Sequence, residues 1–375
     1  MTHNESGGAP AKPKDRNADL PLSRREAFAG LASVGLGISL VGGSAASQTS
    51  PPPPPAAGFP LPPNIATEIR AELQLLAPNV WAFVQREAPN QSNLSVSNCG
   101  VIAGPRGLLA IDATSAPVQA KRFRALAERT TGKTFDKVVI THAHPDHTWG
   151  LQFLGDGLEV IAQEECAAAI ARSSTARPVL WNPRNPAWSD GSESYQLIIP
   201  DTTYTEKMTL RGYGPREVQF LWPGRAHTLG DTNVYLPDEK VIFIGDIGFF
   251  GVTPLNGSGY VGNWIRVCDQ INDMDVTTIV PGHGPVGGKA DLEEMKQYLV
   301  LLWRESKKAF DRGVTPGRAA AEIDLGKYAS WTDSNRVVAN VTRMYAEHAG
   351  TIAASVAPTA MVEARTEYER IKRER

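Results

Sequence analysis

The residues with the clearest chemistry are three histidines and an aspartate packed into positions 142–147, within the run T-H-A-H-P-D-H. Imidazole nitrogen and carboxylate oxygen are the ligands that zinc prefers when no thiolate is offered. Alternate residues of an extended or turning loop face opposite sides, so His142 and His144 can share one metal. Asp146 and His147 follow a proline bend and can reach a second. The pattern favours metal binding over a polar surface loop.

Further residues of the same ligand types follow predicted strands. Short apolar runs of this kind are typical of buried strands, and loops that leave strand ends converge on one rim of an α/β fold. The runs 137–140, 218–222, 241–244 and 278–280 precede His142, His227, Asp246 and His283, respectively. Four strands that each deliver a ligand residue at their carboxyl end predict one shared site.

Four segments carry a resemblance to a known family: T-H-A-H-P-D-H-T-W-G at 141–150, G-R-A-H-T-L-G-D-T-N-V-Y-L-P at 224–237, F-I-G-D at 243–246 and P-G-H-G-P at 281–285. Together they resemble the metallo-β-lactamase fold superfamily, over residues 70–310. The resemblance implies an α/β fold, an αββα sandwich of two mixed sheets face to face with helices outside. It also implies two zinc ions per chain. By position, His142, His144 and His227 would hold the first zinc, Asp146, His147 and His283 the second, and Asp246 would bridge them.

Such a pair of cations explains why these groups are needed. Two metals about 3.5–4 Å apart can clamp the attacking and leaving oxygens, and water on zinc has a pKa of about 7. The resemblance therefore implies hydrolysis by a metal-bound hydroxide, with Asp146 as the catalytic residue that orients it. Asp112 would be a buried support of the metal loop. Thr228 and Asp231 could support an imidazole or only form a turn, and the sequence leaves both readings open.

The N-terminal residues predict an export signal over 1–47. Arg24 and Arg25 precede a weakly apolar, Gly- and Ala-rich stretch at 29–43 and a small-residue end. This order resembles a bacterial twin-arginine signal, and it predicts a periplasmic or secreted protein. A membrane anchor is the alternative, but the apolar run is short for a span of about 20 residues. Residues 48–64 contain a proline run, which predicts a stiff linker.

We expect the remaining chain to form a metallo-β-lactamase-like domain at 65–312 and a C-terminal helical extension at 313–375. His3 and His348 are expected to lie outside the body of the fold. Three widely spaced cysteines exclude a disulfide framework, so buried free thiols are expected. Four aromatic residues could either wall an apolar substrate pocket or pack in the core: Trp181, Trp188, Phe249 and Phe250.

Three functions fit the sequence. The first is an exported dinuclear zinc hydrolase that cleaves a lactone, ester or amide, including β-lactams. The second is a mononuclear iron oxidoreductase of the persulfide dioxygenase type, and the third is a non-catalytic metal-binding module. The expected partner is a small-molecule substrate. A net charge of −2 gives no basic surplus for nucleic acid. No stable membrane insertion is expected after signal cleavage, and the oligomeric state is left open.

Overall fold

The computed structural model describes residues 70–86, 97–173, 196–353 and 355–375, all within one compact unit, Ala57–Arg375. The predicted export signal and linker lie outside the described residues, as do Trp181 and Trp188. In the part of the chain that is described, no helix combines the length and the apolar character needed to cross a membrane.

The first sheet has seven strands in chain order. They are β1 (Arg70–Ala77), β2 (Val80–Arg86), β3 (Cys99–Ala103), β4 (Leu108–Ile111), β5 (Phe135–Ile140), β6 (Glu159–Gln163) and β7 (Thr202–Tyr204). The pairs from β1 to β4 are antiparallel, and those from β4 to β7 are parallel. The sheet is therefore mixed, as expected.

The second sheet has five strands, in the order β12-β11-β10-β9-β8. They are β8 (Lys207–Gly212), β9 (Gly214–Leu221), β10 (Asn233–Leu236), β11 (Val241–Phe249) and β12 (Thr278–His283). Only the β11–β12 pair is parallel. The parallel pair needs a crossover, which α4 (Val261–Asp273) supplies.

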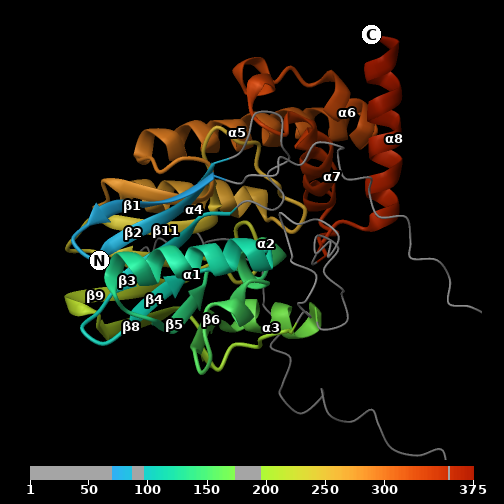
Figure 1. Ribbon diagram of the computed structural model, residues 1–375. Coiled ribbons are helices and arrows are strands. Elements are labelled where there is room, and N and C mark those ends of the chain that lie inside the picture. The colour runs from blue at the N-terminus through green and yellow to red at the C-terminus, as the bar shows by residue number, and fades with distance from the viewer. Residues whose placement is uncertain (1–69, 87–96, 174–195, 354) are drawn as a thin grey trace, which may run out of the picture. The chain divides into compact units, whose positions relative to one another are not determined.

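Helices cover the outer face of each sheet (Figure 1). Helices α1 (Pro117–Thr131) and α3 (Glu164–Arg172) pack on the first sheet, and α4 and α5 (Lys289–Asp311) pack on the second. Alternate side chains of a strand face opposite sides. In β11, for example, Val241 and Phe243 face the space between the sheets, whereas Ile242 faces the helices. This is the αββα sandwich that the resemblance implies.

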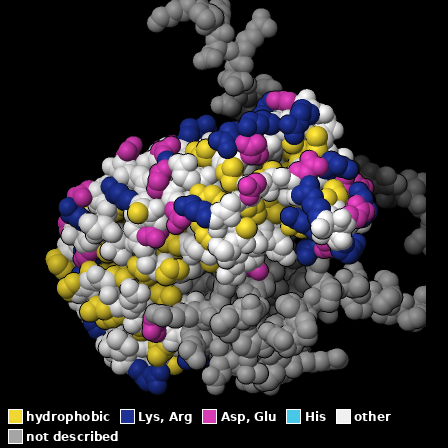
Figure 2. Space-filling model, turned by 90° about the horizontal axis from the view of Figure 1, so that it is seen from above, with side chains coloured by type: hydrophobic (Ala, Val, Ile, Leu, Met, Phe, Trp, Pro, Cys, Tyr) yellow, Lys and Arg dark blue, Asp and Glu magenta, His cyan; other side chains and the backbone are white. Residues whose placement is uncertain are grey.

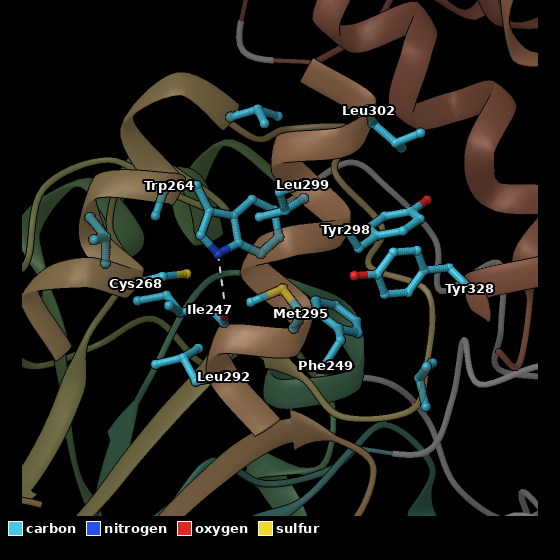
Figure 3. Close-up of a cluster of buried hydrophobic side chains, with 14 of the residues drawn as sticks. Ile247, Phe249, Trp264, Cys268, Leu292, Met295, Tyr298, Leu299, Leu302 and Tyr328 are labelled. Carbon is cyan, nitrogen blue, oxygen red and sulfur yellow. Dashed lines mark hydrogen bonds between the residues drawn. The ribbon is translucent and has the colours of Figure 1, made fainter. Parts of the chain in front are cut away.

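The apolar layer between the second sheet and its helices is centred on Trp264 of α4 (Figure 3). The indole is fully buried, and its Nε1–H donates to the backbone oxygen of Ile247, 3.0 Å away. Leu292 and Met295 of α5 pack in the same cluster. Because Ile247 directly follows Asp246, this layer fixes the back of the strand that carries a predicted metal ligand.

The C-terminal residues form α6 (Pro316–Glu322), α7 (Val337–His348) and α8 (Pro358–Glu374), with two short 3₁₀ turns, η4 (Gly326–Ser330) and η5 (Ser334–Arg336). The expectation that His348 lies outside the fold is wrong. Its imidazole packs on Trp303, with ring centroids 4.3 Å apart. The face shown in Figure 2 carries interspersed positive and negative side chains. Exposed ion pairs of the structure include Arg370–Glu374 of α8. Such surface pairs stabilise a helix only slightly.

One strand runs further than predicted. The apolar run at 241–244 was expected to end before Asp246, but β11 continues through Asp246 to Phe249. Its pairing with β12 shifts register on both sides of Gly245, which has φ of +48°. A β-carbon at Gly245 would lie 2.5 Å from Oγ1 of Thr141. Glycine therefore permits an irregularity that turns Asp246 toward the metal loop.

The three cysteines are buried free thiols, as expected.

Candidate metal centre

The metal loop combines an extended segment with a short helix. After β5, His142 lies on a bending segment and His144 on extended backbone, and α2 (Pro145–Thr148) then carries Asp146 and His147. Proline suits the first position of a helix because it has no N–H to satisfy there. The predicted bend at this proline is therefore a helix start, and it turns Asp146 and His147 toward a different point from the two preceding histidines.

Four side chains form a first ligand set. Nδ1 of His144 lies 3.1 Å from Nε2 of His142 and 2.9 Å from Nε2 of His227. Oδ2 of Asp246 lies 3.6 Å from Nε2 of His142 and 3.3 Å from Nε2 of His227. The four atoms therefore face one small volume.

A second set uses the other oxygen of the same aspartate. Oδ1 of Asp246 lies 3.1 Å from Nε2 of His147 and 3.3 Å from Nε2 of His283. Oδ2 of Asp146 lies 3.6 Å from Nε2 of His147 and 3.1 Å from Nε2 of His283. All seven residues singled out in the sequence are thus brought together, and Asp246 stands between the two sets.

These separations fit divalent metals. Tetrahedral zinc with bonds of about 2.0–2.1 Å places its ligand atoms about 3.3 Å apart, close to the values in both sets. Oδ1 of Asp246 and Nε2 of His147 are buried, and neither has a hydrogen-bond partner. Two ligands of one cation adopt this arrangement because their lone pairs point at the ion and not at each other. The residues present therefore fit the implied metal pair.

Electrostatics distinguish the two sets. Burial lowers the pKa of His142 and His144 and lowers that of His227 to about 3, so these imidazoles are neutral. Burial would also lower the pKa of His283, but Asp246 and Asp146 outweigh it and raise the pKa to about 9. The second set therefore favours positive charge, which a cation would provide as well as a proton does.

Asp112 orients the second set and anchors the loop. Its Oδ2 accepts from Nδ1 of His147 at 2.7 Å and from the hydroxyl of Thr141 at 2.7 Å, and its Oδ1 accepts from the Thr141 amide at 2.7 Å. A carboxylate on Nδ1 fixes the imidazole tautomer and leaves Nε2 free for a metal. The expected role of Asp112 as a buried support is confirmed.

Of the two roles considered for Thr228 and Asp231, the structure shows the turn. The Asp231 carboxylate accepts from the amide and hydroxyl of Thr228 and from the amide of Ala226. Nδ1 of His227 has no hydrogen-bond partner. Asp231 therefore shapes the backbone on both sides of His227 and does not set its tautomer.

Asn98, directly before β3, shapes the loop around His283. Its Nδ2 donates to the carbonyls of Pro281 at 2.9 Å and Gly284 at 2.8 Å. Within this loop, a β-carbon at Gly282 would lie 2.0 Å from Oδ1 of Asp246, so only glycine fits. Asn98 could have been found in the sequence as a polar residue directly before the apolar run at 99–103. Buried polar groups are usually hydrogen-bonded, so a polar residue there indicates a structural partner.

Phe249 and Phe250 pack in the core. Phe249 is 1% exposed, and its ring stacks on His283 with centroids 5.0 Å apart. Its centroid also lies 5.8 Å from that of His227. Phe249 and Phe250 therefore pack in the core and do not line a pocket, and the Phe249 ring packs against the imidazoles of His227 and His283.

The fold and the seven-residue centre define a metallo-β-lactamase-type protein. The family model described as "Metallo-beta-lactamase superfamily" matches residues 93–283. The chain belongs to this superfamily, whose members include hydrolases and other enzymes. The match covers the metal loop and all seven candidate ligands, and it ends before the C-terminal helices.

Two curated proteins and one solved structure illustrate what this chain is similar to. The alpha subunit of 2,4-dinitroanisole O-demethylase from Nocardioides sp. (strain JS1661) is 30% identical over 185 residues, 48% of this chain and 51% of that protein. A linear primary-alkylsulfatase from Pseudomonas sp. (strain ATCC 19151) is 22% identical over 68% of this chain and 53% of its own length. The chain thus spans about half the length of both. The structure of the sec-alkylsulfatase Pisa1 from Pseudomonas sp. superposes with a TM-score of 0.57 and 18% identity, covering 73% of this chain and 50% of that one.

Proposed function

We propose that this protein is a dinuclear zinc hydrolase that cleaves an ester, lactone or amide bond of a small molecule, β-lactams included. One observation carries the proposal: the two oxygens of Asp246 face two separate sets of ligand atoms. A structural zinc site needs only one closed set of four ligands. A bridged pair next to a further carboxylate is an arrangement that supports hydrolysis.

His142, His144 and His227 would hold one ion, His147, His283 and Asp146 would hold the other, and Asp246 would contact both. When bound, the two ions would supply a water of lowered pKa and positive charge to stabilise the leaving group. Every other part of the reaction depends on the protein's own side chains.

Asp146 is the residue best placed to handle a proton. Burial would raise its pKa, but His147 and His283 outweigh this effect and lower it, so the carboxylate is ionised. Its side chain is 12% exposed, against 5% for Asp246. An ionised carboxylate on the accessible side of the centre can accept a hydrogen bond from the attacking water and fix its direction.

The comparisons broaden the substrates to test. The relatives are named for demethylating 2,4-dinitroanisole and for cleaving alkyl sulfates. Both reactions, like the hydrolysis of esters and lactones, cleave a bond to a leaving oxygen. We therefore include an aryl methyl ether and an alkyl sulfate beside the esters, lactones and β-lactams.

Metal content tests the proposal. We expect elemental mass spectrometry of the purified protein to find about two zinc ions per chain, and turnover of at least one substrate in the panel that a chelator abolishes. One iron per chain with oxygen consumption would replace the proposal with the oxidoreductase. Metal bound without turnover of any substrate in the panel would favour the non-catalytic module.

Export is a separate part of the proposal. The Arg24-Arg25 pair before the apolar stretch at 29–43 supports a twin-arginine route to the periplasm or medium. In a bacterial host we expect the full chain to be processed and exported, and a variant with both arginines replaced by lysine to stay in the cytoplasm. Equal export of the two forms would contradict the twin-arginine route.

A further inference from the structure

Helix α7 presents a row of polar side chains that all bond the same segment of backbone. Arg336 immediately precedes the helix, and Asn340, Arg343 and Glu347 follow at intervals of four, three and four residues, which places them on one face. Two of these side chains, Asn340 and Arg343, are 0% exposed. Most of their partners lie in residues 253–262, which comprise the second part of the connection from β11 to α4 and the first two residues of α4. Three further contacts lie outside this segment, at Tyr298, Asp333 and Ala353.

The bonds are spread along the segment from Thr253 to Gly262. Arg336 Nη1 donates to the Thr253 carbonyl at 2.9 Å, and Asn340 Nδ2 donates to the Pro254 carbonyl at 2.9 Å. Asn340 also accepts from the amide of Asn256 at 3.1 Å.

Arg343 and Glu347 hold the second half of the connection. Arg343 donates from Nε to the Gly259 carbonyl at 2.7 Å and from Nη2 to the Ser258 carbonyl at 3.2 Å. Glu347 accepts from the first amides of α4, at Val261 (2.8 Å) and Gly262 (3.1 Å). Hydrogen bonds to charged groups are stronger than those between neutral groups, so the segment is held firmly by α7.

The segment has little polar support from its own side chains. The hydroxyl of Thr253 and both amide atoms of Asn256 are buried without a hydrogen-bond partner. Such groups destabilise the conformation that buries them. The hydrogen bonds from α7 to the backbone therefore offset the cost of burying these unpaired side-chain groups.

The end of the segment touches the metal centre. The amide of Tyr260 donates to the Ala226 carbonyl at 2.7 Å, directly before His227. The guanidinium of Arg343 also lies over the Tyr260 ring, 5.3 Å from its centroid. His227 lacks the side-chain bond to Nδ1 that Asp112 gives His147, so its position depends on backbone contacts of this kind and on packing against Trp264.

We propose that the polar face of α7, with Arg343 at its centre, is a positioning element that holds residues 253–262 and through them the backbone of His227. This inference rests on the proposed role of His227 as a metal ligand. It assigns to the C-terminal helices, which lie beyond the family match at 93–283, a part in forming the first ligand set.

Arg343→Met tests this element, with Arg216→Met as a matched control. Arg216 is also a buried arginine, but it lies near the start of β9 and bonds Pro78 and Glu239. We expect Arg343→Met to speed amide hydrogen exchange in 253–262 at least tenfold. We also expect it to weaken Zn²⁺ binding to the first set about 10–100-fold, the usual effect of losing a support of a ligand.

The control separates positioning from general stability. Arg216→Met should lower the melting temperature without either change. Arg343→Lys keeps the charge and a donor, so both changes should be intermediate; this variant also serves if Arg343→Met does not fold. Unchanged exchange in 253–262 and unchanged Zn²⁺ affinity in the Arg343 variants would overturn the inference. If the unmodified chain binds no Zn²⁺, the proposed function fails, whereas the exchange measurement still decides whether α7 holds the segment.

Discussion

The two ligand sets differ in charge although they share Asp246. The first set consists of three histidines whose pKa burial lowers, and it contains only one oxygen of the shared carboxylate. The second set adds the full carboxylate of Asp146, and its imidazoles have raised pKa values because of the carboxylates around them.

This difference has a consequence for both binding and chemistry. A neutral set binds a cation without displacing protons, whereas a set whose histidines hold protons must release them first. The second set also has the more accessible carboxylate. We therefore expect the first metal to be held with little dependence on pH and the second to be the one coupled to proton movement.

The largest expected effect comes from the carboxylate that belongs only to the second set. Asp146→Asn removes the negative oxygen that accepts a hydrogen bond from water while keeping the size of the side chain. We expect turnover to fall about 10²–10⁴-fold, the usual contribution of a positioned acid–base group. Steady-state kinetics with any active substrate gives the value, and circular dichroism should show an unchanged fold. Turnover within threefold of the unmodified enzyme would remove Asp146 from the reaction.

A second substitution separates the sets directly. His283→Ala deletes a ligand of the second set and leaves the four atoms of the first set in place. We expect the purified variant to retain about one metal per chain, measured by elemental mass spectrometry. His348→Ala removes an imidazole that packs on Trp303 far along the chain and should leave the metal content unchanged. Two tightly held metals in His283→Ala would show that the assignment of ligands is wrong.

Two buried aspartates outside the ligand sets sharpen the comparison. Asp112→Asn loses the charge that orients His147, so we expect affinity at the second set to fall about 10–100-fold. Asp231→Asn can still accept from the amides beside His227, so its effect should be below tenfold and fall on the first set. Competition with a chromophoric chelator measures both. Equal losses in the two variants would mean that the carboxylates act only on general stability.

The site was more predictable from sequence than the elements that hold it. All seven candidate ligands could be named because their chemistry depends on residue type and because four of them lie in one short run. The shared role of Asp246 came from resemblance. The irregularity in β11 that turns Asp246 toward the centre could not be predicted. It depends on the close approach of Gly245 to Thr141, which is 104 positions earlier in the chain.

The C-terminal helices were predicted as helices but without a role. Helix α7 reads as amphipathic, and its polar residues resemble a solvated face when only the periodicity is considered. Arg343 and Asn340 are instead buried against backbone carbonyls. Carbonyl groups leave no pattern in a sequence, so a polar face that binds backbone cannot be told from one that faces water until the fold is known.

The most gradual expected effect is the change of metal affinity with pH, which should differ between the two ligand sets. The pKa of His283 is raised to about 9, so below this pH the proton must leave before the second metal binds. Affinity at the second set should therefore fall as pH falls below 9, about tenfold per unit for each proton released. The pKa of His227 is lowered to about 3, so the first set should keep its affinity between pH 9 and 5. Zn²⁺ titrations at several pH values distinguish the two, because an equal slope for both metals would contradict the difference in charge between the sets.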